Sequence, residues 1–155
     1  MKLSRSIAAV LLACCLAPAV FAQPKLEAST AEEYVPRLGD IMNALQTRHI
    51  KLSLAGKAQN WELAAYELSQ LKAGLLEAAV MYQGIPVSNV TTMTAPVQAI
   101  TDAVAARDAG RFLKASGELR AGCNGCHQTT QRGFIVIQTP TAAPFGDQSF
   151  APRAK

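Results

Sequence analysis

The sequence predicts an all-α protein, an antiparallel up-down-up-down four-helix bundle with an extended C-terminal tail. Apolar residues recur at steps of three and four in four successive segments, and short links join these segments. No alternating strand pattern is long enough for a sheet, and no internal repeat is present. We therefore divide the 155 residues into a signal peptide at 1–22, the helical bundle at 23–132 and a proline-containing tail at 133–155.

The N-terminal segment is typical of a secretory signal. Lys2 and Arg5 precede an apolar run with small residues toward its end, and cleavage is expected near Ala22/Gln23. The run is too short to favour a membrane span. We expect a periplasmic protein, and the alternative is a lipoprotein acylated at Cys14.

Charge and composition exclude several classes of function. Removing Lys2 and Arg5 with the signal peptide lowers the formal net charge from +4 to +2. No cluster of basic residues stands out and aromatic residues are few, so we expect no nucleic-acid binding. No acid/base pair or nucleophile triad is evident, so we do not expect an enzyme.

The first helix is predicted over residues 35–57, with Pro36 in its first turn, where proline is tolerated. Asn60 is a suitable N-cap for a second helix over residues 61–84, which Pro86 would end. The inward face of the first helix comprises Leu38, Ile41, Met42, Leu45, His49 and Leu52. The apolar stripe of the second comprises Trp61, Leu68, Leu71, Leu75 and Ala79.

Residues 86–94 are predicted to form a loop, and Pro96 to begin a third helix that ends at residue 109. Asp108 and Gly110 indicate a break, after which residues 111–131 form the fourth helix. The inner side of this helix is predicted to include Phe112, Leu113, Leu119, Cys123 and Cys126. The tail contains three prolines, so we expect it to be extended, with its apolar residues against the bundle.

The motif CNGCHQ carries the chemistry. Without the signal peptide, Cys123 and Cys126 are the only cysteines left. A redox dithiol belongs at a helix N-terminus after a strand, whereas this motif comes late in a helix. A zinc site needs four ligands, and the chain offers only these cysteines, His127 and the distant His49.

Covalent attachment of haem needs only what the motif contains. Two thiols add to the vinyl groups, and an adjacent histidine binds the iron. On a helix, Cys126 and His127 each lie about one turn from Cys123, so all three can face one flat macrocycle. We therefore predict one covalent haem c, and a haem-free secreted dithiol protein remains the remote alternative.

A four-helix bundle with CNGCH near the end of its last helix resembles the cytochrome c′ family, including its low-spin members. The likeness covers residues 30–132, and AARDAGRF…ELRAGCNGCHQ is its most specific part. The resemblance implies that Cys123 and Cys126 hold the haem, that His127 is the proximal iron ligand, and that the protein is a homodimer built from its first two helices. The tail departs from the family pattern, and residues 134–137 could cover the haem edge.

The family resemblance leaves the distal ligand open. Met42 on the first helix would give His/Met ligation, which suits electron transfer. Ile41 in its place would leave a five-coordinate iron that binds NO or CO. His49 lies about 10 Å further along the helix than Met42, so only one of the two can reach the iron. It is the weaker distal candidate, because a lone histidine on an apolar face is more often a hydrogen-bonded core residue or a propionate partner. Arg132 is a candidate partner for a haem propionate.

These observations predict a periplasmic monohaem c-type cytochrome that transfers single electrons to or from a redox partner protein in the periplasm. The alternative is a five-coordinate haem protein that binds small gases. Membrane attachment is expected only if Cys14 is lipidated.

Overall fold

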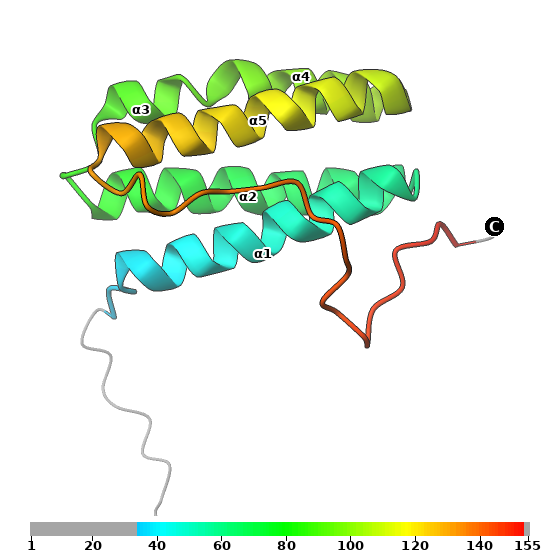
Figure 1. Ribbon diagram of the computed structural model, residues 1–155, viewed down its shortest axis with the longest axis horizontal. Coiled ribbons are helices and arrows are strands. Elements are labelled where there is room, and N and C mark those ends of the chain that lie inside the picture. Colours follow the sequence, from blue (N-terminus) through cyan, green and yellow to red (C-terminus); the bar gives the residue numbers. More distant parts are fainter. Residues whose placement is uncertain (1–33, 154–155) are drawn as a thin grey trace, which may run out of the picture. The chain divides into compact units, whose positions relative to one another are not determined.

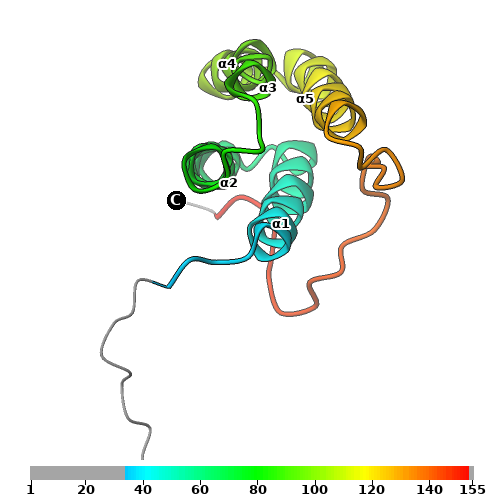
Figure 2. The same cartoon turned by 90° about the vertical axis from the view of Figure 1, so that its left-hand side faces the viewer.

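Helices are the only regular secondary structure in residues 34–153, the part of the chain that the computed structural model describes. They are α1 (Leu38–Lys57), α2 (Trp61–Met81), α3 (Val87–Thr91), α4 (Thr94–Ala105) and α5 (Ala109–Thr129). The four long helices alternate in direction (Figure 1), and along their axes they stand at the corners of a square (Figure 2). This confirms the predicted all-α, up-down-up-down four-helix bundle. The predicted signal peptide and Cys14 lie outside the described residues.

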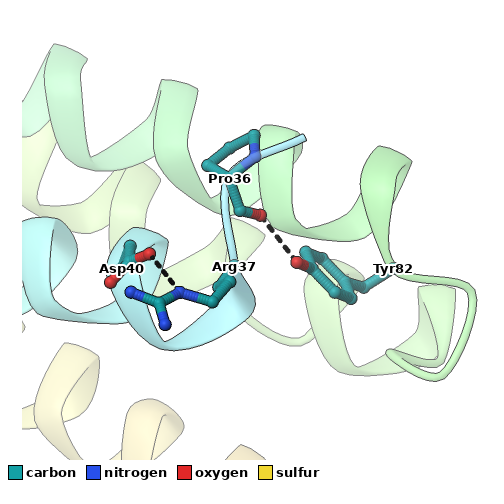
Figure 3. A network of polar contacts seen from close by, with 4 residues as sticks. All are labelled: Pro36, Arg37, Asp40 and Tyr82. Carbon is teal, nitrogen blue, oxygen red and sulfur yellow. Dashed lines mark hydrogen bonds and ion pairs between the residues drawn. The ribbon is translucent and has the colours of Figure 1, made fainter. Parts of the chain in front are cut away.

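Helix α1 begins at Leu38, three residues after the predicted start. Arg37 is its N-cap and has an extended backbone, with ψ at 144°. The Tyr82 hydroxyl, just after α2, donates a hydrogen bond of 2.6 Å to the Pro36 carbonyl, and the Arg37 guanidinium pairs with Asp40 at 3.0 Å (Figure 3). Pro36 is thereby held outside α1 and against the end of α2.

Helix α2 begins as predicted, because the Asn60 side chain accepts a hydrogen bond of 3.2 Å from the Leu63 N–H. It ends at Met81, before the predicted Gly84, since Tyr82 already has an extended backbone. The predicted loop at 86–94 instead contains the single turn of α3. Polar residues that favour loops close this turn: the Thr91 hydroxyl, for example, donates to the Ser88 carbonyl at 2.8 Å.

Helix α4 begins at Thr94 and not at Pro96. Pro96 is its third residue. The backbone N–H groups of the first turn have no partner within the helix, so a proline there removes no helical hydrogen bond. The helix ends at Ala105 because Arg107 adopts a positive φ of 52°. Asp108 then accepts a hydrogen bond of 2.9 Å from the Arg111 N–H and caps α5, which therefore starts earlier than predicted.

The core lies between the four long helices, with α1 packed mainly on α2 and α4 mainly on α5. Helix α1 lies against α5 at Gly56, where a Cβ would overlap the Phe112 ring. Leu113, predicted to face inward, is 65% exposed, because its side chain is one position off the buried row of α5. That row comprises Phe112, Ala115 and Leu119.

The tail contains no helix or strand within its described residues, as predicted, and runs back beside α5 and α1 (Figures 1 and 2). Polar side chains of the bundle hold its backbone. Lys57 donates to the Pro140 carbonyl at 2.7 Å, and Asn60 donates to the Ala151 carbonyl at 3.1 Å. Further along, Phe150 packs against the core.

The apolar run at the start of the tail was predicted to lie against the bundle, but its side chains are exposed. Phe134, Ile135 and Val136 are 82%, 44% and 60% exposed. The hydrogen bonds that attach this part of the tail go to its backbone, so attachment does not require these side chains to be buried.

Candidate functional site

The Cys123–His127 segment occupies the C-terminal end of α5. Cys123 continues the buried row of that helix and packs against the hydrophobic core. Cys126 and His127 are partly buried, and both cysteines are free thiols. The sequence-predicted trio is therefore grouped on one helix end, with one thiol against the core.

The end of α5 is closed by backbone hydrogen bonds. Gln131 has a positive φ of 59°, and the Arg132 N–H donates to the His127 carbonyl at 2.7 Å, which is a Schellman-type helix end. The Thr129 hydroxyl donates to the Cys126 carbonyl at 3.0 Å and accepts from the Asn89 amide of α3 at 2.9 Å. These contacts give the motif a defined backbone geometry.

Burial is the main influence on the two thiols. It raises the pKa of Cys123 to about 11, with the neighbouring Cys126 thiol adding to the shift. Burial also raises the pKa of Cys126, against the opposing effects of Asn89 and Arg132. Both thiols are therefore protonated at neutral pH, whereas a dithiol oxidoreductase needs a thiolate.

The His127 ring has a fixed partner. Its Nδ1 lies 2.7 Å from the backbone carbonyl oxygen of Ile135 in the tail. A carbonyl oxygen can only accept, so Nδ1 carries the proton in the neutral ring and the lone pair remains on Nε2. Two free thiols one turn apart and one histidine nitrogen with a free lone pair form the donor set that haem c requires.

Ile41 and Met42 lie near the start of α1, at the same end of the bundle as the end of α5 (Figure 1). Ile41 is buried, and Met42 is partly exposed. The structure therefore places both predicted distal candidates at the same end of the bundle as the motif, with Ile41 the more deeply buried.

His49 lies further along α1. It is buried, and both burial and the positive charge of Arg120 lower its pKa. Arg120 precedes His127 by seven residues, or about 10 Å along α5. Because His49 is near enough to Arg120 to be affected by its charge, it faces a part of α5 that comes before the motif. It lines a cavity of about 420 Å³ together with Gln46, Ile50, residues 136–142 and Pro144.

Arg132, the predicted propionate partner, lies just beyond α5. Its side chain is exposed and donates to the Thr130 carbonyl at 2.8 Å. Its charge opposes the rise in the Cys126 pKa, which indicates that it lies near that thiol. Arg132 therefore lies beside the motif, and its role as a propionate partner stays a prediction.

Two residues near the motif escaped the sequence analysis. Met93, assigned there to a loop, is buried, and a Cβ on Gly122 would lie 2.7 Å from its sulfur. Asn124, inside the motif, bonds to Ile137 of the tail. The only sequence signal for Asn124 was that a polar residue lies between the two cysteines. Its contact with Ile137 could not be predicted, because the position of Ile137 depends on the tertiary structure.

Two features are absent from the described part of the chain. Within residues 34–153, no three His, Cys, Asp or Glu side chains come together to hold a metal ion. Among the helices of that range, none is long and apolar enough to cross a membrane. Comparisons with protein-family models, curated proteins and solved structures find no match to this chain.

Proposed function

We propose that this chain is a monohaem c-type cytochrome that transfers single electrons. The observation that carries the proposal is the donor set at the end of α5, two free thiols one turn apart followed by a histidine. The hydrogen bond from His127 Nδ1 to the Ile135 carbonyl supports it, because Nε2 is then free to bind iron.

Each residue of the motif has a separate task in this proposal. Cys123 and Cys126 form the two thioether bonds, and His127 is the proximal ligand. Haem, when bound, supplies a one-electron redox couple. The core beside Cys123 excludes water from one side of the site, and Arg132 would pair with a propionate.

The distal position separates electron transfer from gas binding. Met42 as ligand favours electron transfer, since a thioether completes six-coordinate iron. One observation favours the second candidate: Ile41 is 5% exposed and therefore more deeply buried than Met42. With Ile41 above the iron, the protein would bind NO or CO at a five-coordinate haem. His49 as the distal ligand is the weaker alternative, because it is level with Arg120.

Absorption spectra of the purified holoprotein test the distal assignment. Spectra would be recorded for the oxidised, reduced and CO-treated reduced protein, for the wild type, Met42→Ala and the control Met81→Ala. Met81 is an exposed methionine at the end of α2. We expect a low-spin wild type that becomes high-spin and CO-reactive only in Met42→Ala. An unchanged spectrum in that variant would refute ligation by Met42.

The expected partners follow from the same proposal. We propose a periplasmic location, a redox partner protein and a homodimer built from α1 and α2. Exposed apolar side chains on α2, such as Leu76 and Val80, support the dimer. Sedimentation of the holoprotein at several concentrations would test it, and a monomer at every concentration would refute it.

A further inference from the structure

We infer that the C-terminal tail is a positioning element for His127: the Ile135 carbonyl orients the histidine ring, and Asn124 holds the tail in the register that this contact requires. The inference rests on the proposed haem function and deepens it. It assigns a role to Asn124, one of the two residues between the cysteines, and to the tail. Attachment of haem itself requires neither of them.

The chain turns back directly after the motif. The Schellman-type end at Gln131 reverses its direction, and the Ile135 N–H then donates to the Arg132 carbonyl at 2.9 Å. This second turn returns the Ile135 carbonyl to the side of α5, where it lies 2.7 Å from His127 Nδ1. The acceptor is a backbone group, so its position depends on the path of the tail.

Asn124 fixes that path two residues further on. Its side-chain amide donates to the Ile137 carbonyl at 3.0 Å, and its oxygen accepts from the Ile137 N–H at 2.8 Å. Both backbone groups of Ile137 are therefore bound by one side chain, and the contact is partly buried. An asparagine amide can make this pair of bonds because it offers a donor and an acceptor side by side.

The contacts form a regular series along α5. His127 meets residue 135, Asn124 meets residue 137 and Arg120 meets Thr139. Steps of three and four on a helix advance about 5 Å, and steps of two on an extended chain advance nearly 7 Å. The two spacings are close enough for one polar face of α5 to bind alternate tail residues, which defines the register of the whole segment.

The consequence for the proximal ligand is chemical as well as geometric. A carbonyl that accepts from Nδ1 keeps the proton on that nitrogen, fixes the ring orientation and makes Nε2 a stronger donor. A stronger donor stabilises the ferric state. Loss of the contact should therefore shift the reduction potential to more positive values.

The test uses the full-length holoprotein with Asn124→Ala, and Lys57→Met as the matched control. Lys57→Met also removes one tail contact, the bond to Pro140, but at the far end of α1. Hydrogen exchange would be followed at the Ile137 amide, and the reduction potential by spectroelectrochemistry. We expect exchange at Ile137 about tenfold faster in Asn124→Ala, the factor that corresponds to one net hydrogen bond, with a positive shift in potential. The control should change neither.

The outcomes separate the inference from the proposed function. A wild type that attaches no haem would refute the proposed function, while the exchange contrast would still test the Asn124 clamp. Faster exchange with an unchanged potential would show that the tail does not position His127, and unchanged exchange would refute the clamp. If Asn124→Ala does not yield folded protein, Asn124→Ser in the full chain serves instead, because its single short hydroxyl cannot bond to both backbone groups of Ile137: the same potential as the wild type would overturn the inference.

Discussion

At the scale of single residues, the least ordinary feature is a buried carboxylate. Glu67 of α2 is 1% exposed, and its Oε2 lies 3.1 Å from a guanidinium nitrogen of Arg48 on α1. Arg48 also lies over the Tyr66 ring, at 5.9 Å from the centroid. The pair joins α1 to α2.

We expect Arg48→Ala to destabilise the protein by about 2–4 kcal/mol, because it leaves the Glu67 charge buried without a partner. Arg37→Ala, which breaks an exposed pair with Asp40, should cost less than about 1 kcal/mol. Urea unfolding of both variants measures the contrast. Equal costs would show that Glu67 does not depend on Arg48.

His49 makes stability depend on pH. Its pKa in the folded protein lies below the ordinary value of 6.5, because of burial and the charge of Arg120. The unfolded chain therefore binds the proton more readily, so the stabilising effect is complete above about pH 6.5 and declines as pH falls through the folded-state pKa.

We expect the free energy of unfolding of the wild type to decrease more steeply than that of His49→Gln as pH falls below about 6.5. His127 is present in both proteins, so the difference between the two profiles isolates His49. Urea unfolding at a series of pH values measures it. Parallel profiles would mean that His49 is not held neutral.

At the scale of elements, three helix ends share one device. Gln59, Arg107 and Gln131 follow α1, α4 and α5 with positive φ, a conformation that glycine adopts at the lowest cost. Because these three residues carry side chains, each of these Schellman-type ends is less stable than it would be with glycine at the same position.

Arg107→Gly should therefore stabilise the protein by about 0.5–1 kcal/mol, since relief of the strain of the left-handed conformation outweighs the greater unfolded-state entropy of glycine, which opposes it. Thermal unfolding, compared with Arg111→Gly inside α5, measures the effect. The control should be destabilised by a similar amount, because glycine is unfavourable within a helix. Destabilisation in both variants would contradict the account of this turn.

The approach of α1 to α5 depends on Gly56. We expect Gly56→Ala to destabilise the protein by about 1–3 kcal/mol, because its Cβ would overlap the Phe112 ring in a packed core. Gly39→Ala has open space around it and should be neutral or stabilising. Urea unfolding distinguishes the two, and equal effects would show that Phe112 moves aside freely.

The elements also show what sequence reasoning can reach. The cap at Asn60 was predicted, because its side chain can accept a hydrogen bond from the first turn of the helix. Asp108 was predicted only as a break between helices, although its side chain caps α5 in the same way. The end of α1 at Lys57 was predicted. The ends of α4 and α5 gave no comparable signal, since residues other than glycine adopt the left-handed conformation there. The turn of α3 was missed because its polar residues favour loops as readily.

At the scale of the whole chain, one part of the candidate site could likewise be predicted from the sequence and another part could not. The grouping of Cys123, Cys126 and His127 near the end of the last helix was predictable, because it depends only on spacing along that helix. The contact between His127 and Ile135 was not, because it joins the bundle to the tail through a backbone carbonyl. The tail, expected to shield the site with apolar side chains, instead attaches through its backbone and leaves Phe134 exposed.

From residue 35 to the end of the described part of the chain, the bundle and the tail together form one compact unit. Within it, α5 contributes its apolar row to the core and its polar face to the tail. The motif lies where these two faces meet, so the proposed haem site would depend on both the bundle and the tail.

The most direct test of the central claim is the intact mass of the protein, purified after expression with the c-type maturation machinery. It should be compared with that of Cys123→Ser/Cys126→Ser. The account predicts that the wild type carries the mass of one haem, retained after denaturation, and that the double variant carries none. A wild type with the mass of the polypeptide alone would contradict it.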